Sequence, residues 1–182
     1  MNLKGKKLLM MIAPEKFRDE EYEIPFALLS EQGAKITTAS TKKGIAQGMF
    51  GKKATVDTTF DEINAKDFDA IIYVGGQGTP TVRSNAKAVE LAQTFFAQKK
   101  VVAAICWAPT ILAKAGILQN KKATVWLGDD DEYKKKTSQV LNDLGGQFVA
   151  QDVVVDGNIV TGNGPEAAKN FAQALIKVLP KY

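Results

Sequence analysis

The sequence predicts a three-layer α/β sandwich, with a mostly parallel sheet, helices on both faces and one small antiparallel hairpin. Three apolar runs, at residues 8–13, 70–74 and 101–105, lack the alternation of half-exposed strands, as is typical of parallel strands covered on both sides. Amphipathic segments separate these runs. An Asp156-Gly157 turn between two β-branched runs predicts the hairpin. No linker interrupts the pattern, and 182 residues suit one domain over residues 1–182.

In the first half of the chain, local signals define each element. The acidic residues 19–23 indicate the first turn of a helix that stops at Gly33, and Pro25 predicts that the regular helix begins near it or kinks there. The other elements expected in this half are a strand over 8–13, a second strand over 36–40, and an irregular hairpin over 43–58.

In the second half, glycines and capping residues separate strands from helices. Ser84 or Asn85 is the expected N-cap of a helix that runs to Phe96, and Gly116 and Gly145 follow two further helices. The elements expected here are strands over 69–74, 101–105 and 123–127, helices over 107–115 and 133–144, the hairpin over 153–161, and a last helix over 165–179.

The residue counts exclude several classes of site. The chain has no histidine, which rules out imidazole zinc sites, Ser-His-Asp triads and Cys-His dyads. Cys106 is the only cysteine, so an internal disulfide is excluded. We expect neither a metal site nor a cofactor.

The charge pattern gives no indication of a nucleic-acid or membrane partner. The net charge of +4 comes from short, scattered lysine runs, and only Arg18 and Arg83 are arginines, which is typical of solvated surface. No apolar stretch approaches the roughly 20 residues of a membrane span, and residues 8–13 are too few for a signal peptide. We therefore expect a cytoplasmic protein.

The strongest local signal for chemistry is the segment Val101-Val102-Ala103-Ala104-Ile105-Cys106-Trp107-Ala108-Pro109. A buried strand leads directly into a helix, with Cys106 at the junction and the small residues Ala104 and Ala108 two positions on either side, as a nucleophile elbow requires. A helix N-terminus favours a thiolate, so a lowered pKa is expected for Cys106. The alternative is a buried structural cysteine.

Two other segments are expected at the same edge of the sheet. Gly75-Gly76 ends a predicted parallel strand, where backbone N–H groups approach a ligand or an oxyanion; the alternative is a simple tight turn. The loop over residues 14–21 follows the first strand and contains Arg18 among four carboxylates; the alternative is a charged helix start. The acidic residues 129–132 are interpreted as a helix N-terminus with Asp129 and Glu132 as a capping pair, in preference to a cation site.

These segments, together with the Val155-Asp156-Gly157-Asn158 hairpin, resemble the ThiJ/PfpI superfamily over nearly the whole chain. The resemblance implies a flavodoxin-like, class I glutamine-amidotransferase-like fold, a homodimer or larger homo-oligomer, and an oxidisable cysteine at Cys106. The family includes glyoxalase-like or deglycase enzymes that act on small oxoaldehydes, chaperone-like stress proteins and intracellular proteases.

Two departures from the family's pattern bear on the site. Trp107 occupies the position where the protease members have histidine, which argues against a Cys-His peptidase. Arg18 follows Phe17 where the glyoxalase-like members have glutamate. Arg18 cannot act as a base, so we expect a carboxylate of this loop to move the proton. The candidates are Glu15, Asp19 and Glu20, and Glu15 is favoured because it is nearest to the end of the first strand.

The sequence leaves three functional hypotheses open. In the first, a Cys106 thiolate adds to a small carbonyl compound, with the N–H groups of Gly76 and Trp107 as the oxyanion hole and Glu15 and Arg18 assisting. In the second, Cys106 is a redox sensor whose sulfenic or sulfinic acid is stabilised by Arg18. In the third, the protein is a chaperone-like homo-oligomer in which the thiol is incidental.

Overall fold

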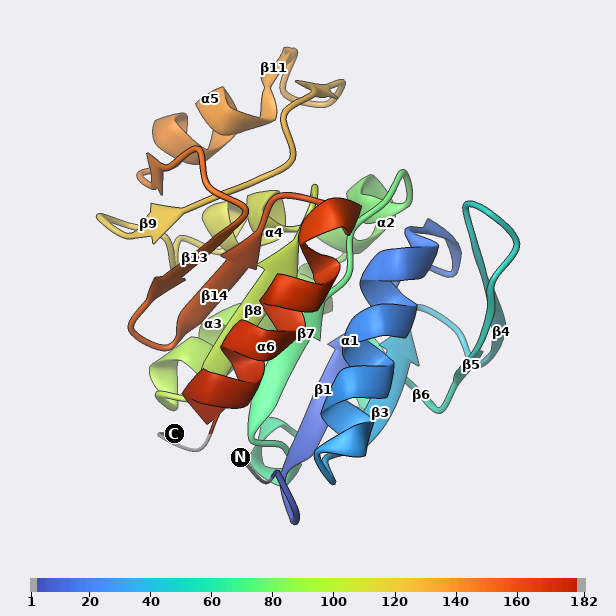
Figure 1. Cartoon of the computed structure of the whole chain (residues 1–182). Coiled ribbons are helices and arrows are strands. Elements are labelled where there is room, and N and C mark those ends of the chain that lie inside the picture. The colour runs from blue at the N-terminus through green and yellow to red at the C-terminus, as the bar shows by residue number, and fades with distance from the viewer. Residues whose placement is uncertain (1–2, 180–182) are drawn as a thin grey trace.

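The computed structural model describes residues 3–179, and a seven-stranded sheet forms its centre (Figure 1). The strand order across the sheet is β13-β14-β8-β7-β1-β3-β6. The strands are β1 (Lys7–Met11), β3 (Lys35–Ser40), β6 (Thr58–Thr59), β7 (Ala70–Tyr73), β8 (Val101–Ile105), β13 (Val153–Asp156) and β14 (Ile159–Gly162).

The topology of this sheet is that of a flavodoxin-like α/β fold. All neighbouring strands pair in parallel except the edge strand β13, which runs antiparallel to β14 across the predicted Asp156-Gly157 turn. From β1 the chain passes to β3 on one side and then crosses to β7 on the other. The switch point therefore lies between β1 and β7, and ligands of such sheets bind at the carboxyl ends of the strands there.

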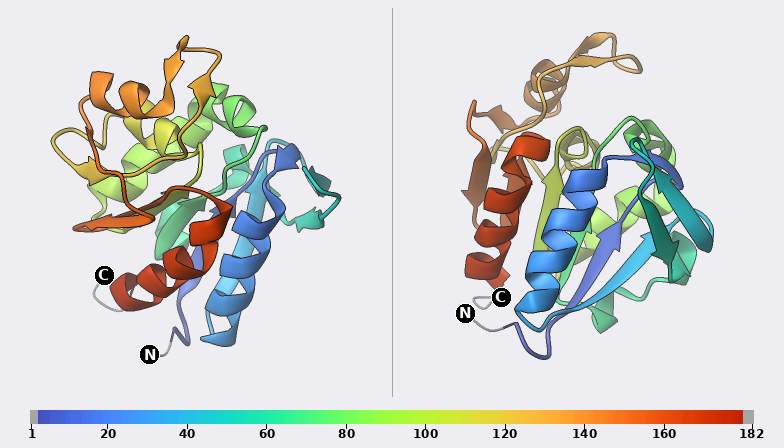
Figure 2. Two further views of the ribbon diagram at one scale, coloured as in Figure 1. Left: turned by 45° about the horizontal axis from the view of Figure 1, so that its top comes forward. Right: turned by 45° about the vertical axis from the view of Figure 1, so that its right-hand side comes forward.

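Helices cover both faces of the sheet, as the sequence predicts. α1 and α6 lie side by side on one face, where Leu29 and Phe171 pack with Leu8 and Met10, and α3 and α4 cover the other (Figures 1 and 2). The helices are α1 (Asp19–Glu31), α2 (Thr79–Ser84), α3 (Ala86–Ala97), α4 (Pro109–Lys114), α5 (Thr137–Asp143) and α6 (Ala168–Val178), with single 3₁₀ turns at Phe60–Glu62, Ala65–Asp67 and Pro165–Ala167. Among residues 3–179, no helix is both long enough and apolar enough to cross a membrane.

Three small sheets surround this core. The hairpin expected over 43–58 is present and extends to one side of the sheet in Figure 1. The strands of the small sheets are β2 (Glu15–Phe17), β4 (Gly44–Gly48) and β5 (Lys53–Val56); β9 (Lys122–Ala123) and β12 (Gln147–Phe148); and β10 (Asp129–Asp130) and β11 (Lys135–Lys136).

The structure corrects several predicted boundaries. The first helix begins at Asp19 and contains Pro25, although we expected it to begin near this proline or to kink there. The short helix α2 was not predicted. Asn85 is the N-cap of α3, since its side chain accepts from the Ala88 N–H at 3.0 Å.

The largest differences fall between residues 123 and 136. The predicted strand over 123–127 is reduced to Lys122–Ala123, because the Thr124 N–H donates to the Thr161 hydroxyl and the Trp126 N–H to the Cys106 carbonyl instead of to a strand. The helix expected from residue 133 begins at Thr137. The interpretation of Asp129 and Glu132 as its capping pair is wrong, because Asp129–Asp130 pairs with Lys135–Lys136 in a hairpin.

Candidate functional site

Cys106 occupies the sharp turn between β8 and α4 that the sequence predicts. Its φ of 65° lies in the left-handed region, which residues other than glycine rarely adopt and which is common at functional sites. Ala104 and Ala108 on either side are fully buried, so larger side chains would find no space there. The turn is fixed by two main-chain hydrogen bonds, from the Cys106 N–H to Gly162 and from the Trp126 N–H to the Cys106 carbonyl, both 2.8 Å long.

The diglycine after β7 lies directly against this turn. A Cβ atom on Gly75 would stand 2.7 Å from the Cys106 Cβ and 2.8 Å from the Glu21 Oε2, which no side chain tolerates. Gly76 has a φ of 107°, and a Cβ there would stand 2.5 Å from the backbone nitrogen of Arg18. The two glycines therefore let the ends of β1, β7 and β8 converge at the thiol.

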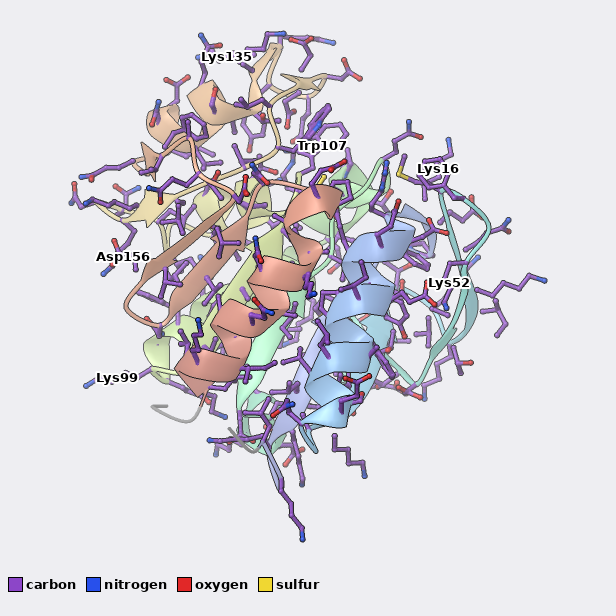
Figure 3. The ribbon with its side chains drawn as sticks, in the orientation of Figure 1. Lys16, Lys52, Lys99, Trp107, Lys135 and Asp156 are labelled. Atoms are coloured by element: carbon purple, nitrogen blue, oxygen red, sulfur yellow. The ribbon has the colours of Figure 1, made fainter. Side chains whose placement is uncertain are left out.

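The sulfur of Cys106 faces two backbone donors and a small cavity. The N–H groups of Gly76 and Trp107 both donate towards it. Cys106 is only 8% exposed, but it lines a cavity of about 200 Å³. The cavity is lined by Arg18, Met49, Gly76, Gln77, Cys106, Trp107, Trp126 and Pro165. Figure 3 shows Trp107 at the same end of the molecule as Lys16 of β2, and Lys99 at the opposite end.

The carboxyl group beside the thiol is that of Glu21, which the sequence analysis did not select. Glu21 lies in the first turn of α1 and is fully buried, and within residues 3–179 its oxygens have no hydrogen-bond partner of good geometry. Burial raises its pKa to about 8, although the Cys106 thiol, the Arg18 charge and the Gly75 N–H each act to lower it. Glu21 is therefore protonated at neutral pH and titrates close to it.

Glu21 was missed because the carboxylate was chosen by its closeness to the end of the first strand and not by the face of the helix on which it lies. In the helix that actually begins at Asp19, Glu21, Pro25 and Leu29 are spaced four residues apart, and all three are buried. A helical periodicity extended back from Leu29 would have placed Glu21 on the inward face.

The predicted lowering of the thiol pKa is wrong. Burial raises the pKa of Cys106 well above its ordinary value and a Glu21 carboxylate raises it further, while the N–H groups of Gly76 and Trp107 oppose both effects. The helix N-terminus favours the thiolate, but the loss of solvent and the neighbouring Glu21 outweigh it. Cys106 and Glu21 are thus a coupled pair, whose first proton leaves at a pH set by both groups.

The structure separates the two residues that were predicted to assist Cys106. Arg18 lines the thiol cavity, where its guanidinium donates to Glu20 at 2.8 and 3.2 Å and lies 4.6 Å from the centre of the Phe50 ring. Glu15 does not reach the thiol. It is exposed on β2 and lines a different cavity with Lys16 and Gln47, so Glu21 and not Glu15 is the carboxyl next to Cys106.

The buried state of Glu21 predicts an unusual pH dependence of stability. Between pH 4.5, its ordinary pKa, and about pH 8, the folded protein holds a proton that the unfolded chain has lost. Because the folded state binds more protons there, the free energy of unfolding falls as pH rises, by up to about 1.4 kcal/mol per pH unit. Urea unfolding at pH 5.5, 6.5 and 7.5 should show that the free energy of unfolding of Glu21→Gln, relative to that of the wild type, increases at each step. Parallel curves for the two proteins would contradict the raised pKa.

Fold and site together define an α/β protein with a cysteine at a nucleophile elbow, held against a diglycine turn and a buried glutamate. Residues 6–178 match the model of the DJ-1/PfpI family, and the chain belongs to that family. It is 35% identical to the deglycase PfpI of Pyrococcus furiosus over 94% of this chain and 98% of that protein. It is 42% identical to an uncharacterized protein of Methanocaldococcus jannaschii over 99% of this chain and 85% of that one. The solved structure of a ThiJ/PfpI domain protein from Brachyspira murdochii has a TM-score of 0.90 and 34% identity, covering 98% of this chain and 99% of that one.

Proposed function

We propose that the protein is a Cys106-dependent enzyme of the deglycase or glyoxalase type, acting on small carbonyl compounds such as 2-oxoaldehydes. The observation that carries the proposal is the placement of one thiol among two backbone N–H donors and a buried carboxyl group whose pKa is about 8. A general acid–base works best when its pKa is near the working pH. The name of the Pyrococcus furiosus relative, a deglycase, agrees with this chemistry.

The size of the cavity supports a small substrate. Pockets for drug-sized ligands measure about 300–1,000 Å³, whereas the cavity at Cys106 measures about 200 Å³. Trp107 and Trp126, whose ring centres are 5.9 Å apart, both line it. A compound of three or four carbon atoms suits this space better than a peptide does.

The proposed reaction begins with proton transfer within the coupled pair. Ionised Glu21 accepts the thiol proton while Sγ bonds to the aldehyde carbon, and the C=O electron pair moves onto the oxygen. The N–H groups of Gly76 and Trp107 stabilise this oxyanion, and Glu21 returns the proton to it, giving a hemithioacetal. The hydrogen of the former aldehyde carbon then moves as a proton to the neighbouring carbon, and the hydroxyl proton moves to the neighbouring oxygen, which gives a 2-hydroxy thioester. Water then hydrolyses the thioester, releasing the hydroxy acid and restoring the thiol.

Methylglyoxal tests the proposal. The wild type is expected to convert many equivalents per chain into lactate, and Cys106→Ser is expected to produce none above the uncatalysed rate. Lactate is measured enzymatically and methylglyoxal by its absorbance as it is consumed. Wild-type protein that forms no more lactate than Cys106→Ser would overturn the proposal.

The second candidate is redox sensing, and the donors around the sulfur favour it. A sulfinate at Cys106 would accept from the N–H groups of Gly76 and Trp107 and from protonated Glu21, next to the Arg18 charge. Two equivalents of hydrogen peroxide each give one oxygen to the sulfur and leave as water, which adds about 32 Da in two successive oxidations. Such a product, together with no turnover of methylglyoxal, would favour the sensor over the enzyme.

A further inference from the structure

A second buried charge cluster lies behind the cysteine turn, and the proposed reaction does not use it. Its centre is Arg83 of α2, which is completely buried. The guanidinium donates to both carboxylate oxygens of Asp130, at 2.5 and 3.0 Å, and to Glu132 at 2.8 and 3.1 Å. The Tyr133 ring lies over it, 4.9 Å from the guanidinium carbon. The positive charge is therefore fully paired by one short segment, residues 130–133.

The cluster contacts Trp107 at both ends of that residue. At the side-chain end, the Trp107 indole N–H donates to the Asp130 Oδ2 at 2.7 Å. At the main-chain end, the Trp107 carbonyl accepts from the Thr110 hydroxyl at 2.8 Å, and the same hydroxyl accepts from the Arg83 Nη1 at 2.9 Å. One arginine thus fixes the ring of Trp107 through Asp130 and its backbone through Thr110.

The position of Trp107 gives these contacts a consequence for the thiol. Trp107 directly follows Cys106, whose φ of 65° persists only because the surroundings hold it. The backbone N–H of Trp107 donates towards the sulfur, and Trp107 lines the thiol cavity. A small rotation of Trp107 would therefore turn a donor away from the sulfur and open one wall of the cavity.

We propose that Arg83, Asp130 and Thr110 are positioning residues for Trp107. They hold its backbone N–H directed at the Cys106 sulfur and its ring against the thiol cavity. The inference rests on the proposed role of Cys106 as a nucleophile. None of the three residues lines the cavity at the thiol. They act through Trp107. The indole N–H that donates to Asp130 explains why position 107 is a tryptophan.

The test measures how the rate of Cys106 alkylation by iodoacetamide depends on pH. Trp107→Phe keeps the backbone N–H and an aromatic ring but removes the indole donor, and Thr110→Val keeps the shape but removes the hydroxyl. Each variant is expected to raise the pH midpoint of alkylation by about half to one unit, the worth of one weakened hydrogen bond. A change in access alone would alter the limiting rate and leave the midpoint in place.

Tyr73→Phe is the matched control. The Tyr73 hydroxyl is also buried and donates to the Ala88 carbonyl at 2.6 Å, so this variant also loses one buried aromatic donor, away from the cluster. It is expected to lower the melting temperature and keep the wild-type midpoint. Alkylation of Cys106 does not require catalytic turnover. If the wild type formed no lactate, the proposed function would be wrong, but the alkylation test would still apply.

Each other outcome overturns the inference. Unchanged midpoints in Trp107→Phe and Thr110→Val would show that the cluster serves stability only. An equal shift of the midpoint in Tyr73→Phe would show that the loss of any buried hydrogen-bond donor changes the alkylation of Cys106. A shift in one of the two variants alone would contradict the claim that Trp107 is held at both ends.

Discussion

Glu21→Gln is expected to lower kcat/KM for methylglyoxal by about 10²–10⁴-fold, the usual contribution of a general acid–base. Glutamine keeps the shape of the side chain and fills the same buried space, but it cannot accept the thiol proton or return it to the substrate oxygen. Steady-state kinetics at pH 8 measure the effect, since Glu21 has a pKa of about 8 and half of it is ionised there.

Glu15→Gln is the matched control for this prediction. Glu15 precedes the same helix, but it is exposed and lines another cavity, so its amide variant should stay within about threefold of the wild type. If Glu15→Gln lost activity while Glu21→Gln kept it, the assignment from the structure would be wrong and the expectation from the sequence would be right.

Arg83→Leu is expected to lower the free energy of unfolding by about 3–5 kcal/mol, because it leaves a buried carboxylate without its counter-ion. The side chains of Arg83 and Asp130 are both completely inaccessible to solvent, so water cannot replace the lost partner. Urea unfolding followed by circular dichroism measures the change.

The chain's other arginine provides the control. Arg18 pairs with Glu20 in a partly exposed ion pair, whose side chains are 26% and 42% accessible. Arg18→Leu should therefore change the free energy of unfolding by less than about 1 kcal/mol. Equal effects of the two substitutions would contradict the buried ion-pair network.

The sequence predicted the parts of the fold that depend on local pattern. Continuous apolar runs correctly located β1, β7 and β8, because strands covered on both faces need apolar residues at every position. Small residues around Cys106 located the sharp turn, and Gly75-Gly76 located the place where a backbone must approach another closely. In each case a steric requirement is visible in a few consecutive residues.

The sequence failed where long-range contacts determine the structure. Asp130 was assigned to a helix start because nothing near it shows that Arg83, 47 residues earlier, supplies its partner. The lowered pKa predicted for Cys106 rested on the helix N-terminus alone, whereas burial and Glu21 come from distant parts of the chain. Glu21 itself could have been found from the sequence, because it is spaced four and eight residues from the buried Pro25 and Leu29 of the same helix.

The most direct test of the central claim, that Cys106 and Glu21 act as one proton-sharing pair, is the pH dependence of iodoacetamide alkylation in the wild type and in Glu21→Gln. We expect a midpoint well above that of an ordinary thiol in the wild type, because burial and the Glu21 carboxylate both raise the pKa of Cys106, and a lower midpoint in Glu21→Gln, where that carboxylate is gone. The same midpoint in both proteins would show that Cys106 titrates independently of Glu21 and would contradict the account.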